Sequence, residues 1–110
     1  MGTRDALGLI CLDLTEDAET ARHQLRRLAA GHGLDLTDTM TYRRTESGWI
    51  YRLIESVHHL GAHAVVAPGH QHVDGAELAV TGVADLIAPG AHHPYIGYGP
   101  GFVRPSRVQR

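Results

Sequence analysis

The residues of this 110-residue chain whose types and spacing could support chemistry follow two apolar stretches. Asp13 comes directly after residues 8–12, and the loop at residues 69–74 comes directly after residues 62–67. A carboxylate beside an imidazole can act as a general base, bind a small ligand or hold a metal ion. The candidate ligand-binding side chains are Asp13, His70, His72 and Asp74.

Other features of these residues indicate structural roles. The chain has nine histidines, but none stands in a dense zinc-binding pattern such as CxxC or HExxH. His58 and His59 fit the end of a helix, where the helix dipole favours positive charge. Cys11 lies inside an apolar stretch with no cationic neighbour in sequence, so its thiol should be inert. The sequence therefore implies no cofactor and assigns no metal site.

Alternating strand and helix patterns must position the candidate residues. Strands are predicted at 6–12, 34–42, 62–67 and 83–88, and helices at about 16–31, 45–60 and 76–81. This order predicts an α/β domain, a small three-layer fold of flavodoxin-like type with a largely parallel four-stranded sheet and helices on both faces. Asp74 and Glu77 have the spacing of a capping box for the last helix. Residues 1–90 should form this domain, and residues 91–110 an irregular tail rich in Gly, Pro, His and Arg.

Ligand-facing groups of such folds lie at the carboxyl ends of the strands. If the first and third strands are neighbours, Asp13 should therefore lie near the loop at residues 69–74.

Two stretches carry a family resemblance. Residues 8–13 read Gly-Leu-Ile-Cys-Leu-Asp, and residues 69–74 read Gly-His-Gln-His-Val-Asp. Over residues 8–88, at low identity, the chain resembles the catalytic domain of serine recombinases, the resolvase and invertase family. The first strand of that family typically reads Gly, Tyr, any residue, Arg, Val, Ser, and its third strand leads into an Asp-Arg pair with another Arg three residues beyond.

The resemblance implies a shared resolvase-like fold whose reacting groups have been replaced. Asp13 stands where the family has its serine nucleophile, and Cys11 stands where an arginine helps to bind the scissile phosphate. His70 and Gln71 replace the Asp-Arg pair, and Asp74 replaces the further arginine. Phosphoryl transfer needs a nucleophile and cations that stabilise the transition state, and an anionic Asp13 would repel a phosphate. The chain also stops before the family's long dimerisation helix and helix-turn-helix domain, so we expect no strand-exchange activity.

The amino-acid composition excludes several kinds of chemistry and indicates where the protein is located. The chain has no lysine, which excludes a P-loop lysine and a Schiff-base lysine. One cysteine allows no internal disulfide, and we find no secretion signal and no apolar run of membrane-spanning length, so we expect a cytoplasmic protein without membrane contact. The net charge of −2 disfavours strong nonspecific DNA binding.

Three functions remain. The leading hypothesis is a non-catalytic recombinase-like domain that acts by contact with a protein, as a homodimer or within a nucleoprotein assembly. The second is a small enzyme, or a ligand- or metal-binding domain, that uses Asp13 with His70 or His72. The third is a residual DNA-binding protein. Its nucleic-acid candidates are Arg43, Arg44, Arg104, Arg107 and Arg110.

Overall fold

A five-stranded sheet forms the centre of the molecule in the computed structural model, which describes residues 4–97. The strands are β1 (Arg4–Cys11), β2 (Leu34–Tyr42), β3 (Ala64–Val66), β4 (Asp85–Ala88) and β5 (Ala91–His93). They lie in the order β2-β1-β3-β4-β5; the first four are parallel, and β5 runs antiparallel to β4. The predicted α/β class with a largely parallel sheet is confirmed, with one strand more than predicted.

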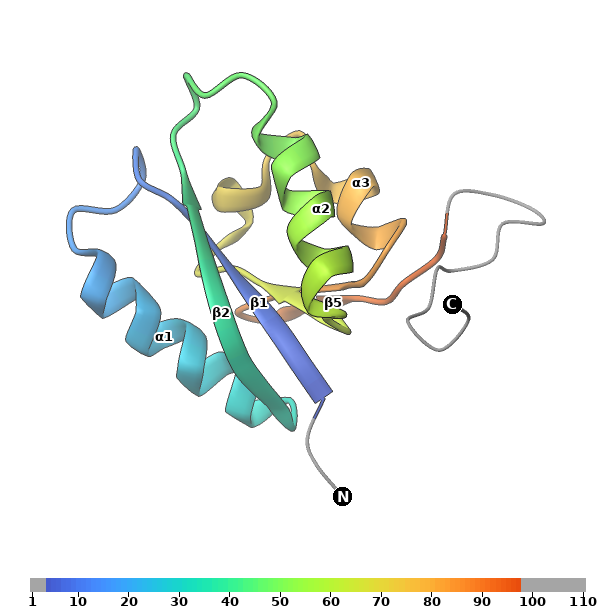
Figure 1. The fold of residues 1–110 in the computed structure, drawn as a ribbon. Coiled ribbons are helices and arrows are strands. Elements are labelled where there is room, and N and C mark those ends of the chain that lie inside the picture. Colours follow the sequence, from blue (N-terminus) through green and yellow to red (C-terminus); the bar gives the residue numbers. More distant parts are fainter. Residues whose placement is uncertain (1–3, 98–110) are drawn as a thin grey trace.

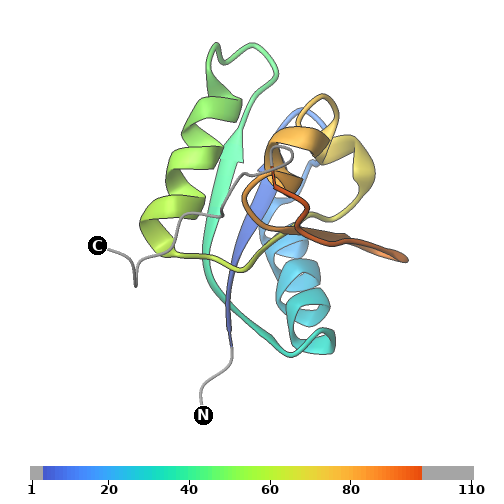
Figure 2. The same ribbon diagram turned by 90° about the vertical axis from the view of Figure 1, so that its right-hand side faces the viewer.

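Helices cover both faces of this sheet (Figures 1 and 2). α1 (Ala18–Gly31) covers one face, and α2 (Trp49–Leu60) and α3 (Glu77–Thr81) cover the other. A 3₁₀ turn, η1 (His70–Val73), follows β3. No helix among residues 4–97 is long and apolar enough to cross a bilayer.

The alternation of side chains along β1 builds two cores. Ala6 and Ile10 face α1, whereas Leu7, Leu9 and Cys11 face α2. Both faces of β1 are therefore buried, which explains its nearly continuous apolar sequence.

The ends of the helices follow local signals. The carboxylate of Asp17 accepts hydrogen bonds from the backbone N–H groups of Glu19 and Thr20 and so caps α1. α2 ends at Gly61, whose φ of 70° is in the left-handed region that glycine adopts most easily.

Two local predictions about the second half of the chain are wrong. Asp74 does not cap α3, because it ends η1 and a turn at Gly75 (φ 85°) follows it. Ala76 occupies the cap position without a side-chain hydrogen bond, and Glu77 accepts from the backbone N–H of Gly75. Residues 91–93, expected in an irregular tail, form β5. The turn at Gly90 (φ 74°) reverses the chain and lets it pair with the open side of β4. The rest of the expected tail, from residue 98 on, lies outside the described residues.

At Gly8, β1 lies close to the side chain of Leu25 on α1. A Cβ atom at Gly8 would lie 2.7 Å from Cδ1 of Leu25 and 3.1 Å from Oγ1 of Thr39. Leu25 is fully buried and cannot move into solvent. We therefore expect Gly8→Ala to lower the free energy of unfolding by about 1–3 kcal/mol, measured by urea unfolding.

Gly31 provides the matched control for this prediction. It closes α1, and a Cβ there would meet nothing within 4 Å. Gly31→Ala should leave stability unchanged or raise it by up to about 1 kcal/mol. Equal stability of Gly8→Ala and the unmodified chain would contradict the close approach of β1 and α1.

Candidate functional site

The candidate site lies at the carboxyl ends of β1, β2 and β3, at the upper end of the sheet in Figure 1. The chain places β2 on one side of β1 and β3 on the other, so the ends of β1 and β3 flank the topological switch point where α/β proteins usually bind ligands. Because β1 and β3 pair directly, the loops that follow them are adjacent. The end of β1 contacts the loop at residues 69–74 through Cys11 and His72. The closeness of Asp13 itself to this loop stays a prediction.

His72 occupies this switch point with its own side chain. β3 is short, and its last pair with β1 joins Val66 to Gly8. Beyond that pair β1 has no neighbouring strand on this side, and Nδ1 of His72 accepts the backbone N–H of Cys11 at 2.9 Å. His72 is buried, with 7% of its surface exposed. His72 therefore continues the hydrogen bonding of β1 where β3 has ended.

The hydrogen bond with Cys11 fixes the protonation state of His72. A nitrogen that accepts a hydrogen bond carries no proton, so the ring is neutral with its proton on Nε2. Burial lowers the pKa of His72, and the positive charge of Arg44 lowers it further. The ring is thus held in the neutral form that the contact needs.

Tyr42 closes the site from the side of β2. Its hydroxyl donates to the backbone carbonyl of His72 at 2.5 Å, and its ring stacks on Trp49 with centroids 3.8 Å apart. Burial, together with the adjacent thiol of Cys11, raises the pKa of the phenol, which stays protonated. Tyr42 is not among the site residues predicted from the sequence; its place as the last residue of a parallel strand is the signal that could have found it.

Asp13 lies at the rim of the site and is engaged within the chain. Its carboxylate accepts the backbone N–H of Arg44 at 2.7 Å and the guanidinium of Arg43 at 3.3 Å. The thiol of Cys11 lies 3.8 Å from the same carboxylate. These contacts, chiefly the N–H of Arg44, lower the pKa of Asp13 and keep it ionised.

The four side chains expected to share one ligand do not converge. His70 points instead to β5, where its Nε2 atom lies 3.3 Å from Nε2 of His93. Gln71 in η1 and Asp74, which directly follows η1, are exposed. Within residues 4–97, no group of three or more His, Cys, Asp or Glu side chains is arranged to hold a metal ion. The predicted combination of Asp13, His70, His72 and Asp74 is therefore not formed, because η1 turns its two histidines in different directions.

The arginine candidates near the site are partly neutralised. Arg43 pairs with Asp13, and the nearby Arg52 makes two contacts of 2.8 Å with Glu46. Arg44 is exposed. The remaining candidates, Arg104, Arg107 and Arg110, lie outside the described residues.

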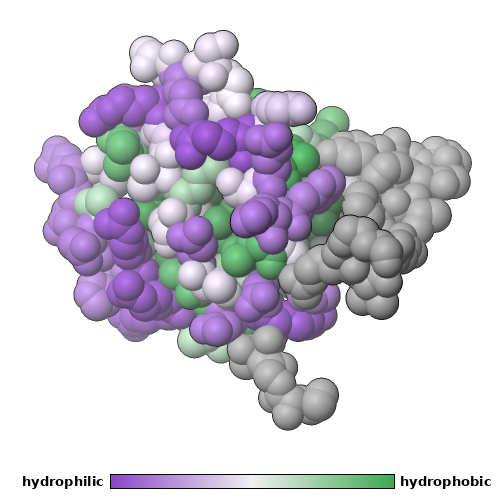
Figure 3. Space-filling model, viewed as in Figure 1, coloured by the Kyte–Doolittle hydropathy of each residue, from purple (hydrophilic) through white to green (hydrophobic). Residues whose placement is uncertain are grey.

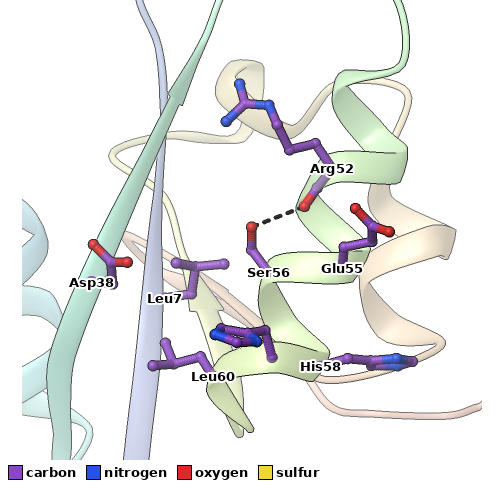
Figure 4. Close-up of a pocket in the computed structure, with 8 residues that line it drawn as sticks. Leu7, Asp38, Arg52, Glu55, Ser56, His58 and Leu60 are labelled. Carbon is purple, nitrogen blue, oxygen red and sulfur yellow. Dashed lines mark hydrogen bonds between the residues drawn. The ribbon is translucent and has the colours of Figure 1, made fainter.

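A separate groove runs between β2 and α2, away from the strand ends (Figure 4). Leu7 and Leu60 form its apolar part, and it has a volume of about 520 Å³. Its polar lining residues are Asp38, Arg52, Glu55, Ser56, His58 and His59. The guanidinium of Arg52 is paired with the carboxylate of Glu46, and the hydroxyl of Ser56 donates to the backbone carbonyl of Arg52. The groove mixes both signs of charge and shows no converging set of groups for one ligand.

Acidification is expected to destabilise the protein through His72. The pKa of His72 in the folded chain is below the ordinary value of 6.5. In acid the imidazole is therefore protonated more readily in the unfolded chain than in the folded chain. The stabilising contribution is complete above pH 6.5 and is lost as the pH falls below it. Urea unfolding at about pH 7.5 and about pH 5 should show this loss.

His72→Asn separates this effect from the titration of the other histidines. An asparagine Oδ1 atom can accept the hydrogen bond of Cys11 but does not titrate. The variant should lose less stability than the unmodified chain between the two pH values. The same loss in both proteins would show that His72 does not resist protonation.

Comparison with known proteins leaves the site without an external precedent. No family model matches the chain, and neither the curated proteins nor the solved structures include a significant match.

Proposed function

We propose that this chain is a non-catalytic, recombinase-like α/β domain that acts in the cytoplasm through contact with another protein. One observation carries the proposal: three polar side chains at the strand ends are engaged in the chain's own hydrogen bonds. Nδ1 of His72 accepts from Cys11, the Tyr42 hydroxyl donates to the carbonyl of His72, and Asp13 accepts from Arg44. The imidazole, the phenol and the carboxylate that could react are therefore occupied by hydrogen bonds at the strand ends.

The charge at this end of the sheet supports the absence of phosphodiester chemistry. The resemblance places Asp13 at the position of a serine nucleophile, and the structure holds this carboxylate ionised. The guanidinium of Arg43 lies beside that carboxylate, so its charge is already compensated. Cys11, at the position of a phosphate-binding arginine, is fully buried. At the position of the family's nucleophile, a phosphate would therefore meet an ionised carboxylate.

Exposed apolar side chains on and beside α2 and α3 supply a surface for a partner. Tyr51 on α2 is 72% exposed, Leu78 on α3 is 78% exposed, and Ile96 is 65% exposed. The backbone N–H of Ile96 bonds to the carbonyl of Thr81, which places Ile96 beside the end of α3. Figure 3 shows apolar surface over α3. Large apolar side chains this exposed are typical of contact surfaces when they cluster.

The first test is self-association. Light scattering coupled to gel filtration, over a range of concentrations, should show a dimer that Leu78→Ser weakens. Leu14→Ser is the matched control, because Leu14 is an exposed leucine (38%) in the loop after β1, away from α3. A monomer at every concentration, together with no capture of a partner that Leu78→Ser releases, would refute the proposal.

The second test addresses catalysis directly. The protein is incubated with supercoiled and linear DNA, quenched with denaturant, and examined for a covalent protein–DNA adduct. We expect none from the unmodified chain or from Asp13→Ser, since the latter restores a hydroxyl without the guanidinium groups that phosphoryl transfer needs. An adduct formed by the unmodified chain would overturn the non-catalytic assignment.

A further inference from the structure

Two histidines from separate segments face each other at the sheet edge formed by β5. His70 begins η1 and His93 ends β5, and their Nε2 atoms lie 3.3 Å apart. The rings are nearly perpendicular, with centroids 5.2 Å apart. Both side chains are exposed, so an ion can reach them from solvent.

The separation of the two nitrogens is that of two ligands on one metal ion. Zn–N bonds of about 2.0–2.1 Å in tetrahedral geometry put neighbouring ligand nitrogens about 3.3–3.4 Å apart. Imidazole is a favoured ligand of Zn²⁺, Cu²⁺ and Ni²⁺. The observed 3.3 Å therefore matches the spacing of two nitrogens on one ion, and a bound ion would replace the direct contact between the two nitrogens.

The segments that carry the two rings are held independently of each other. His93 pairs with Leu86 in the β4–β5 ladder, and the carboxylate of Asp85 accepts the backbone N–H of Tyr95 just beyond it. On the other side, the N–H of His72 bonds to the carbonyl of Gly69 around the start of η1. Two ligands on held segments form a chelate with little loss of conformational freedom on binding.

The neighbouring histidines are differently engaged. His92 points to the other face of the sheet, where its Nε2 atom lies 3.1 Å from a carboxylate oxygen of Asp85 and its ring meets the edge of His32. Within residues 4–97, no third protein ligand completes a set with His70 and His93. The remaining coordination positions are therefore left to water.

We propose that His70 and His93 form a two-histidine surface site for a divalent transition-metal ion, with Zn²⁺ as the probe. The ion would cross-link β5 to the turn that follows β3, two segments 23 residues apart in sequence. This site is distinct from the strand-end cluster around His72 and is independent of the proposed contact function.

The test is calorimetric titration of the untagged, chelator-treated full chain with Zn²⁺ in a non-coordinating buffer. His70→Gln and His93→Gln should each weaken Zn²⁺ binding at least about tenfold, because each removes one of two protein ligands. His92→Gln is the matched control: it removes an exposed histidine from the same strand and should leave the affinity unchanged.

Two further readouts make the outcome decisive. Zn²⁺ should raise the melting temperature of the unmodified chain and of His92→Gln, and not that of the other two variants, since the site exists only in the folded chain. The electron paramagnetic resonance spectrum of bound Cu²⁺ should show coupling to two imidazole nitrogens. Zn²⁺ affinity that survives both the His70 and the His93 substitution, or that falls equally with His92→Gln, would overturn the proposal.

Discussion

Tyr42→Ala is expected to lower the free energy of unfolding by about 3–5 kcal/mol, the range for removing a buried aromatic side chain. Tyr42 is 3% exposed, stacks on Trp49, and bonds to the carbonyl of His72. Its loss would open a cavity in the core beneath α2 and leave a buried carbonyl without its donor. Urea unfolding followed by tryptophan fluorescence measures the change, since the chain has a single tryptophan in direct contact with Tyr42.

Two variants divide this loss into its parts. Tyr42→Phe keeps the stacked ring and removes only the hydroxyl, so it should cost about 1–3 kcal/mol. Tyr51→Ala removes a tyrosine that is 72% exposed and should stay within about 0.5 kcal/mol of the unmodified chain. If Tyr42→Phe were neutral, the hydroxyl would not be joining β2 to η1.

His72→Ala should be the next most damaging change at the site, at about 2–4 kcal/mol. It removes a buried ring, and it leaves the backbone N–H of Cys11 without an acceptor on the side of β1 where β3 has already ended. Thermal and urea unfolding with circular dichroism would measure it.

The matched substitution is His72→Asn, which retains an acceptor oxygen near the position of Nδ1. It should cost about half as much as His72→Ala. The same loss in both variants would show that packing of the ring, and not the bond to Cys11, is what matters. Together with Tyr42→Phe, this pair of variants tests whether the strand-end cluster is structural, as the proposed non-catalytic function requires.

Much of the fold was predictable from short-range patterns. Residues 34–42 alternate as an exposed strand does, and β2 has those bounds. The helix predicted at about residues 45–60 is present as α2, which spans Trp49–Leu60. Such patterns record whether a side chain is buried and where the backbone must turn, and both are local properties.

β5 was not predictable in the same way. Its three residues, Ala91–His93, carry no alternation of apolar and polar side chains. They form a strand because β4 presents an open edge and Gly90 turns the chain toward it. A strand this short depends on the sheet beside it more than on its own sequence.

The candidate site shows the same division. From the sequence alone, Asp13 and the loop at residues 69–74 could be placed at the strand ends. Only the tertiary structure shows that His72 accepts a hydrogen bond from β1, that Tyr42 donates one to His72, and that His70 faces His93. These contacts join residues 61, 30 and 23 positions apart. Strand order, strand length and the direction of one 3₁₀ turn decide them, and no local pattern encodes those three together.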